Sequence, residues 1–256
     1  MNVVCCQLDI DWEDKAANCA KAQVMLESAG VGEGSLVILP EMFATGFSMN
    51  VAGIAESHDE LTQTFLAATA AEYRSWVLGG LVTCGPDGLG RNEAVVFSPE
   101  GREIARYCKM YPFTHAGEDE HYVPGREVVL FDCGGFQVAP FICYDLRFPE
   151  VFRLAMREGA QLFAVIANWP AARESHWPTL LQARAIENQA YVAGVNRCGQ
   201  DPNRAFCGRS MIVDPKGRIL VDAGSGECTV QARADLESLL AYRREFPVLG
   251  DAREDY

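Results

Sequence analysis

Short, wholly apolar runs alternate with helical stretches along this chain, and this alternation limits its fold more than any other feature. The runs Leu36–Leu39 and Leu162–Ala167 contain no polar residue, as is typical of strands in the interior of an α/β protein. We therefore expect a single-domain, four-layer α-β-β-α sandwich that spans residues 1–256, with helices outside and two sheets inside.

The expected elements follow one another without a long linker, and a charged tail covers about 245–256. Helix Asp14–Ala29 is expected to bury Ala17, Ala20 and Val24 on one face and to stop at Gly30. Strands are expected over Asn2–Leu8, Leu36–Leu39, Trp76–Thr83, Glu103–Cys108, Val128–Asp132, Gln137–Ile142, Leu162–Ala167, Tyr191–Asn196 and Glu227–Ala232. Further helices are expected over Leu61–Tyr73, Pro149–Glu158, Trp177–Gln189 and Asp235–Glu245.

Two hairpins have similar sequences. Val95–Ile104 and Met211–Leu220 each place apolar residues around an x-Pro-x-Gly turn, with proline at the second turn position and glycine at the fourth. This weak internal repeat is too degenerate for a solenoid, and it suggests two similar halves of one sandwich.

The charge balance limits the partners of the protein. Its 22 basic and 35 acidic residues give a net charge of −13, which disfavours nucleic acid and anionic membrane surfaces. No apolar stretch approaches the roughly 20 residues that a membrane helix needs. A few arginines inside a cleft can still attract a small anionic substrate.

Ten cysteines are scattered along the chain without a CxxC pair, so we expect no zinc site. No signal peptide precedes the first expected strand. Most of the cysteines are therefore expected to be buried, reduced side chains in a cytoplasmic protein.

Cys143 is the strongest candidate for a reactive cysteine. It follows an apolar strand and precedes a turn into a helix that starts near Pro149. A thiolate at such a turn lies near a positive helix terminus. A buried structural thiol is the alternative.

Residues that could activate Cys143 come from elsewhere in the chain. The histidines, none of which the sequence singles out, are His58, His115, His121 and His176. Glu41 directly follows an apolar strand, where partial burial would raise the pKa of a carboxylate toward the range of a general base. Lys109 ends another strand and could stabilise an oxyanion. A solvated loop acid and a surface lysine are the alternatives.

Three segments together resemble the nitrilase (carbon–nitrogen hydrolase) family. They contain a Pro-Glu pair, a lysine and a Cys-Tyr-Asp-x-Arg turn, in the order of the family's signature segments, and they are Leu39–Phe43, Tyr107–Phe113 and Phe141–Glu150. The resemblance extends over nearly the whole chain, including Asn168-Trp169-Pro170 and Ala183–Asn188.

This resemblance implies a role for each residue. Cys143 would be the nucleophile and Glu41 the general base, while Lys109 and the backbone N–H of Tyr144 would form the oxyanion hole. A thioester intermediate would form without a metal or an organic cofactor.

The family often uses a second glutamate between the lysine and the cysteine. Glu118 is the better match and Glu120 the second choice. Because residues 117–120 are acidic throughout, a plain solvated loop is the alternative.

Within the family, the segments 168–177 and 187–191, together with Cys143–Pro149, resemble those of bacterial omega-amidases. Omega-amidases hydrolyse the side-chain amide of α-keto acid amides such as 2-oxoglutaramate and 2-oxosuccinamate. The compact length of the chain also favours an amidase over a nitrile hydrolase. A homodimer that pairs through helices on one face is expected by the same resemblance.

A substrate of this kind carries a carboxylate, which arginine can bind in a bidentate manner. Arg173 is the first choice and Arg204 a weaker one, while Phe47 and Trp169 could form apolar walls. Alternatives for these residues are a surface salt bridge and core packing.

A structural ion pair between Arg147 and Glu187 is a further possibility. Hydrolysis of N-carbamoyl amines is the chief rival activity, because it uses the same triad with a different pocket. A non-catalytic subunit and an amidotransferase-type module are two further hypotheses. The complete triad argues against the first, and the lack of a phosphate-binding glycine loop argues against the second.

Overall fold

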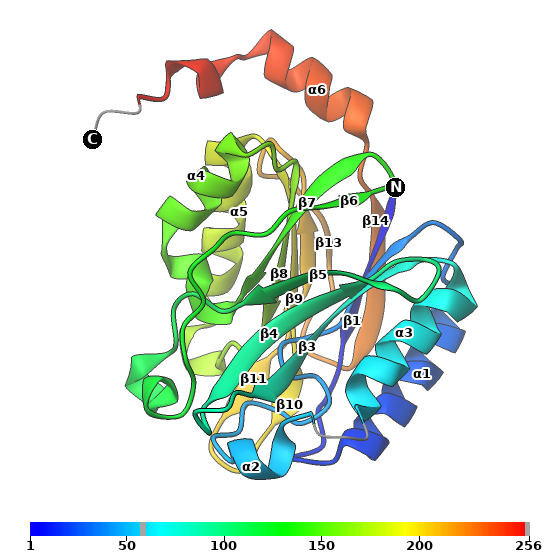
Figure 1. Ribbon diagram of the computed structural model, residues 1–256. Coiled ribbons are helices and arrows are strands. Elements are labelled where there is room, and N and C mark those ends of the chain that lie inside the picture. Colours follow the sequence, from blue (N-terminus) through cyan, green and yellow to red (C-terminus); the bar gives the residue numbers. More distant parts are fainter. Residues whose placement is uncertain (57–59, 254–256) are drawn as a thin grey trace.

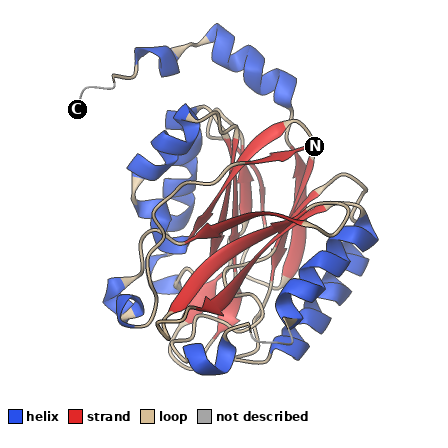
Figure 2. Ribbon diagram, in the orientation of Figure 1, coloured by secondary structure: helices blue, strands red, loops and turns tan. Residues whose placement is uncertain are grey.

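The computed structural model describes residues 1–56 and 60–253, and it has the expected four-layer α-β-β-α architecture (Figures 1 and 2). The first six-stranded sheet has the order β14 (Cys228–Arg233), β1 (Asn2–Gln7), β2 (Leu36–Ile38), β3 (Trp76–Cys84), β4 (Gly90–Phe97) and β5 (Glu103–Cys108). The second has the order β13 (Ile219–Asp222), β12 (Met211–Val213), β9 (Tyr191–Asn196), β8 (Leu162–Ala167), β7 (Phe136–Ile142) and β6 (Phe131–Cys133).

Two pairs of helices form the outer layers. The first sheet is covered by α1 (Lys15–Ala29) and α3 (Leu61–Tyr73), and the second by α4 (Pro149–Arg157) and α5 (His176–Asn188) (Figure 1). The last helix, α6 (Leu236–Glu245), lies across one end of the sandwich.

Alternate side chains of β1 pack into two different layers of the core. Val3 and Cys5 lie in the core between the sheets, whereas Val4 and Cys6 lie in the core beneath α1 and α3. Successive side chains of a strand point to opposite faces, so a strand between two apolar layers must be apolar throughout.

The predicted inner face of α1 was wrong. Val24 is 61% exposed, and Ala17 and Ala20 lie outside the buried stripe. The buried residues are Asn18, Cys19, Ala22 and Leu26. Asn18 turns inward because its side chain donates to the backbone carbonyl of Ala44 at 2.8 Å, which rotates the buried stripe around the helix.

The predicted strand Val128–Asp132 begins too early, because only Phe131–Cys133 pairs with β7. The two similar hairpins are confirmed. The backbone N–H groups of Gly101 and Gly217 donate to Ser98 and Asp214, and each hairpin lies at one end of its sheet.

A third hairpin, which the sequence did not predict as strands, consists of β10 (Cys198–Gln200) and β11 (Ala205–Cys207). It carries the loop that contains Arg204.

The cysteines are unpaired within the described residues, and most are buried. Cys84 is exposed, and the partly exposed cysteines are Cys108, Cys207 and Cys228. Burial as small apolar side chains is therefore confirmed for six of the ten.

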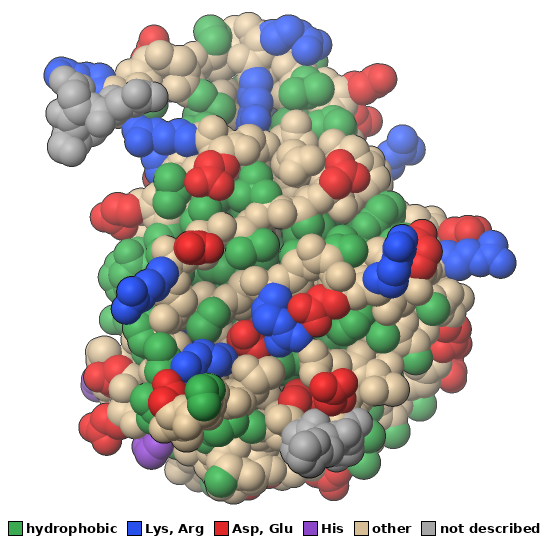
Figure 3. All heavy atoms as spheres, viewed as in Figure 1, with side chains coloured by type: hydrophobic (Ala, Val, Ile, Leu, Met, Phe, Trp, Pro, Cys, Tyr) green, Lys and Arg blue, Asp and Glu red, His purple; other side chains and the backbone are tan. Residues whose placement is uncertain are grey.

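Acidic and basic side chains are interspersed on the face drawn in Figure 3. Every helix in the described part of the chain is too short or too polar to cross a membrane.

Candidate active site

Four strands end at one edge of the sandwich, and each is followed by a polar or nucleophilic side chain. Glu41 follows β2 and Lys109 follows β5, while Cys143 and Asn168 follow β7 and β8. β2 runs parallel to β3, and β7 runs parallel to β8, so their carboxyl ends lie together. Sites in layered α/β proteins commonly form at such carboxyl ends.

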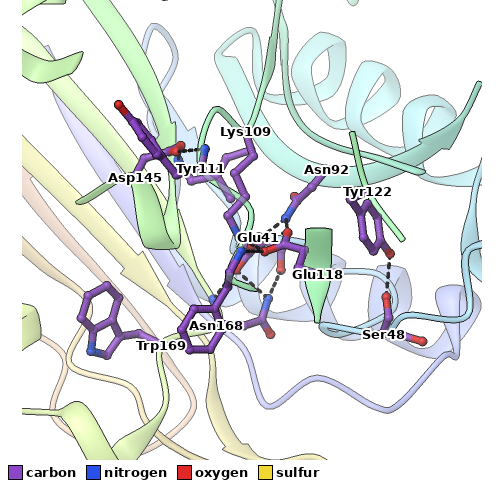
Figure 4. A network of polar contacts seen from close by, with 12 residues as sticks. Glu41, Ser48, Asn92, Lys109, Tyr111, Glu118, Tyr122, Asp145, Asn168 and Trp169 are labelled. Atoms are coloured by element: carbon purple, nitrogen blue, oxygen red, sulfur yellow. Dashed lines mark hydrogen bonds and ion pairs between the residues drawn. The ribbon is translucent and has the colours of Figure 1, made fainter. Parts of the chain in front are cut away.

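Glu41, Lys109 and Glu118 form a buried cluster (Figure 4). Lys109 Nζ lies 3.0 Å from Glu41 Oε1 and 2.8 Å from Glu118 Oε2. Asn92 Nδ2 donates to Glu41 at 2.7 Å and to Glu118 at 2.9 Å, which holds the two carboxylates on either side of the ammonium group.

Each carboxylate in this cluster accepts four hydrogen bonds. Besides Lys109 and Asn92, Glu41 accepts from the backbone N–H of Asn168 at 2.7 Å and from its Nδ2 at 3.3 Å. Glu118 accepts twice from Lys109 and once each from Asn92 and the backbone N–H of Phe113. Four donors match the lone-pair sites of a carboxylate, so the position of each glutamate is fixed by its hydrogen bonds.

Burial and charge act on the pKa values of the neighbouring groups. Burial lowers the pKa of Lys109, but Glu118 and Glu41 outweigh it and raise the pKa above its ordinary value, so Lys109 is cationic. Burial, reinforced by Glu41, raises the pKa of Cys143 well above its ordinary value despite the opposing effect of Lys109. The resting side chain is therefore a thiol, and not the thiolate expected from its position at a turn.

The turn that carries Cys143 is held from below by Asp145. Cys143 has φ +47°, a left-handed conformation that favours glycine and is often retained at functional sites. Asp145 accepts from the backbone N–H groups of Ile142 and Tyr111, each at 2.9 Å, and from Tyr107 Oη at 2.8 Å. Burial raises the pKa of Asp145 to about 7. Because Tyr107 and Tyr111 flank Lys109, this contact fixes the cysteine turn to the lysine segment.

Gly80 allows Glu41 to approach β3 closely. A Cβ at Gly80 would lie 2.5 Å from the backbone nitrogen of Met42 and 2.6 Å from Glu41 Cα. The absence of a side chain is therefore required at this position.

A cavity lies beside the cluster, and it brings together the residues predicted to bind the substrate. Its lining is aromatic and basic, and consists of Phe47, Phe113, Cys143, Tyr144, Arg147, Asn168, Trp169, Pro170, Arg173 and Arg204. The Phe47 ring, which lines the cavity, has its centroid 5.2 Å from Lys109 Nζ in the cluster.

Three arginines line this cavity without an ion-pair partner among the described residues. Arg173 lies over the Phe113 ring at 5.3 Å, and Arg204 lies over the Phe47 ring at 5.6 Å. The pKa of Arg147 is lowered by burial and by the charge of Arg173. The cavity therefore carries positive charge within an acidic protein.

Arg147 was not predicted to bind substrate, and its suggested ion pair with Glu187 is absent from the described structure. Glu187 pairs with Arg184 at 2.9 Å, one turn earlier on α5. Arg147 instead stacks over the Trp169 ring at 4.6 Å and lines the cavity. The signature turn includes Arg147, but the direction in which the Arg147 side chain points depends on its packing against Trp169.

Asn92 was also missed, because a lone asparagine within a strand has no distinctive sequence pattern. Glu120 is exposed, whereas Glu118 is fully buried, so only Glu118 joins the cluster.

His58 lies outside the described residues, and none of the described histidines lines the cavity beside Cys143. In the described part of the chain, no group of three or more His, Cys, Asp or Glu residues could hold a metal ion.

Comparisons with known proteins agree with this geometry. Residues 2–244 match the family described as carbon-nitrogen hydrolase. The chain belongs to this family. This carbon-nitrogen hydrolase is 40% identical over 247 residues to "Omega-amidase YafV" of Yersinia enterocolitica, covering 96% of this chain and 94% of the relative. It is 34% identical over 254 residues to "2-oxoglutaramate amidase" of Bacillus subtilis (strain 168), covering 99% of this chain and 98% of the relative.

A solved structure supports the same assignment. A CN-hydrolase superfamily protein from Xanthomonas campestris, which has an arsenic adduct in its active site, superposes with a TM-score of 0.93 and 32% identity. The match covers 100% of this chain and 98% of that one. The protein is therefore a hydrolase of carbon–nitrogen bonds with the nitrilase-superfamily fold.

Proposed function

We propose that this carbon-nitrogen hydrolase is an omega-amidase. Its substrates would be short amides with a carboxylate at the far end, namely α-keto acid amides such as 2-oxoglutaramate and 2-oxosuccinamate. The relatives named omega-amidase and 2-oxoglutaramate amidase support this substrate class.

One observation carries the proposal. Cys143 lines a cavity together with three arginines that have no carboxylate partner among the described residues, and the Glu41–Lys109–Glu118 cluster lies beside it. With its amide next to Cys143, the substrate would have its far carboxylate near the arginines. Arg173 remains our first choice for that contact, with Arg147 and Arg204 beside it and with Phe47, Tyr144 and Trp169 as walls.

In the first half of the reaction, the sulfur of Cys143 would form a bond to the amide carbon while its proton passes to Glu41. The ammonium group of Lys109 and the backbone N–H of Tyr144 would stabilise the oxyanion. Glu41 would then return the proton to the nitrogen, the carbon–nitrogen bond would break, and ammonia would leave a thioester.

In the second half, water would attack the thioester carbon. Glu41 or Glu118 would take its proton, the carbon–sulfur bond would break, and the sulfur would recover its proton. The raised pKa of Cys143 supports this sequence, because a thiol needs a base at the moment of attack.

The deciding experiment measures ammonia release from 2-oxoglutaramate, glutamine and N-carbamoyl-β-alanine under the same conditions. We expect fast turnover of 2-oxoglutaramate and slower turnover of glutamine, since the α-ammonium of glutamine would face the arginines. Turnover of the carbamoyl compound alone would replace this proposal with the rival activity.

A homodimer and a cytoplasmic location are also proposed. The exposed Leu154 on α4 and Ile186 on α5, 44% and 53% exposed, support pairing through these helices. Light scattering on the purified protein tests the dimer, and a monomer mass at micromolar concentration would contradict it.

A further inference from the structure

We infer that the side-chain oxygen of Asn168 accepts an N–H group of the substrate's primary amide, and so selects amides over esters. This inference rests on the proposed hydrolysis at Cys143. It adds a specificity contact to that site.

Asn168 lies at the position where such a contact is needed. It follows β8 directly, is only 5% exposed, and lines the same cavity as Cys143. The backbone of Asn168 is also close enough to Cys143 to lower the pKa of its thiol by hydrogen bonding.

The hydrogen bonds of Asn168 determine which way its amide faces. Its Nδ2 donates to the backbone carbonyl of Glu41 at 2.7 Å and to Glu41 Oε2 at 3.3 Å. Both contacts need a donor, so the nitrogen faces Glu41 and the oxygen faces away from it.

The loop that carries Asn168 is held from behind. Trp169 donates its backbone N–H to Asn196 Oδ1 at 2.7 Å, and Asn196 Nδ2 donates to the Trp169 carbonyl at 3.2 Å. The Asn168 side chain is therefore fixed at both its backbone and its amide nitrogen.

Asn168 Oδ1 is left without a protein donor among the described residues, although it is buried. A buried acceptor without a donor is unfavourable and uncommon, and it calls for an explanation. A ligand that brings an N–H group into the cavity would provide the missing donor.

A primary amide has two N–H groups that need acceptors. Glu41, which faces the departing nitrogen in the proposed reaction, already accepts four hydrogen bonds from protein donors. Its carboxylate therefore has little capacity left for both amide hydrogens. Among the buried side-chain oxygens without a donor in the described residues, Asn168 Oδ1 is the one that belongs to a residue lining the cavity.

The contact with Asn168 Oδ1 would distinguish amides from esters by their leaving groups. An ester of the same acid has no N–H group on its leaving atom, so Asn168 Oδ1 would remain without a donor. An amide would satisfy it while Glu41 delivers the proton to the nitrogen and the carbon–nitrogen bond breaks.

The test compares kcat/KM for 2-oxoglutaramate with kcat/KM for the ω-methyl ester of the same acid, in the wild type, Asn168→Ser and Asn92→Ser. Asn92 is the matched control, because it also donates to Glu41 but does not line the cavity. We expect Asn92→Ser to slow both substrates by a similar factor. Asn168→Ser should slow the amide about tenfold more than the ester.

An equal loss for both substrates in Asn168→Ser would overturn the inference. If that variant does not fold, as judged by circular dichroism, Asn168→Asp decides, because it keeps an acceptor oxygen. Its amide-to-ester ratio should stay within about twofold of the wild type, and a ratio about tenfold lower would count against the contact. A wild type that releases no ammonia from the amide would instead refute the proposed function.

Discussion

Two neighbouring regions of this protein use charge in opposite ways. In the buried cluster, Glu41 and Glu118 surround Lys109, and every carboxylate oxygen accepts hydrogen bonds from protein donors. In the cavity, Arg147 and Arg173 have aromatic rings beside them and no carboxylate partner among the described residues.

The buried cluster therefore provides a fixed catalytic geometry, whereas the arginines of the cavity are available to bind the substrate. A saturated cluster cannot rearrange without leaving a buried charge unpaired, so its geometry is set before a substrate arrives. Arginines without carboxylate partners can form their ion pairs with the substrate. The following predictions test this division.

The largest effect is expected from Cys143→Ala. Loss of the sulfur should abolish ammonia release from 2-oxoglutaramate while the cluster and the fold persist, because the substitution removes one atom from a buried turn. A thermal melt close to that of the wild type, measured together with the assay, checks both parts. Substantial residual turnover would exclude Cys143 as the nucleophile.

The next largest effect concerns the cluster. Glu118→Gln should lower kcat roughly a hundredfold or more, because it removes one of the two negative charges that hold Lys109. Glu120→Gln is the matched control, since Glu120 is exposed two residues later, and it should change kcat by less than about twofold. A larger loss of kcat in the Glu120 variant than in the Glu118 variant would make Glu120 the auxiliary glutamate in place of Glu118.

A smaller effect is expected at the arginines. Arg173→Ala should raise KM for 2-oxoglutaramate roughly ten- to a hundredfold with little change in kcat, the effect of losing a charged hydrogen bond of about 1.5–3 kcal/mol. Arg74→Ala serves as control, because Arg74 is exposed and pairs with Glu33. An unchanged KM in the Arg173 variant would show that this side chain does not hold the substrate.

The smallest effect is expected on the pKa of Cys143, which can be measured without turnover of substrate. Glu41 raises the pKa of the Cys143 thiol, so Glu41→Gln should lower that pKa even though it removes the proposed base. More thiolate should then be present at a given pH. The ultraviolet difference titration between Glu41→Gln and the same variant carrying Cys143→Ala measures this change. An unchanged or higher pKa would contradict the electrostatic account of the site.

Much of the site could be predicted from local sequence. Glu41 and Cys143 each follow an apolar run that had to be a strand, and the three signature segments fixed the family resemblance. The structure places Glu118, and not the exposed Glu120, beside Lys109, and the catalytic role of Glu118 stays a prediction.

Other features depend on packing between distant segments. The inner face of α1 was misjudged because Asn18 bonds to Ala44 in a loop far along the chain. The ion pair suggested between Arg147 and Glu187 was wrong, because Arg184, on the same helix as Glu187, pairs with that carboxylate.

The sequence by itself determined the alternation of strands and helices and singled out the side chains proposed to react, because periodicity and local motifs depend on neighbours along the chain. The tertiary structure decided which donors saturate Glu41, where the arginines face, and which acceptor remains open on Asn168. These properties depend on distances between segments that lie far apart in the chain, and local patterns carry no measure of such distances.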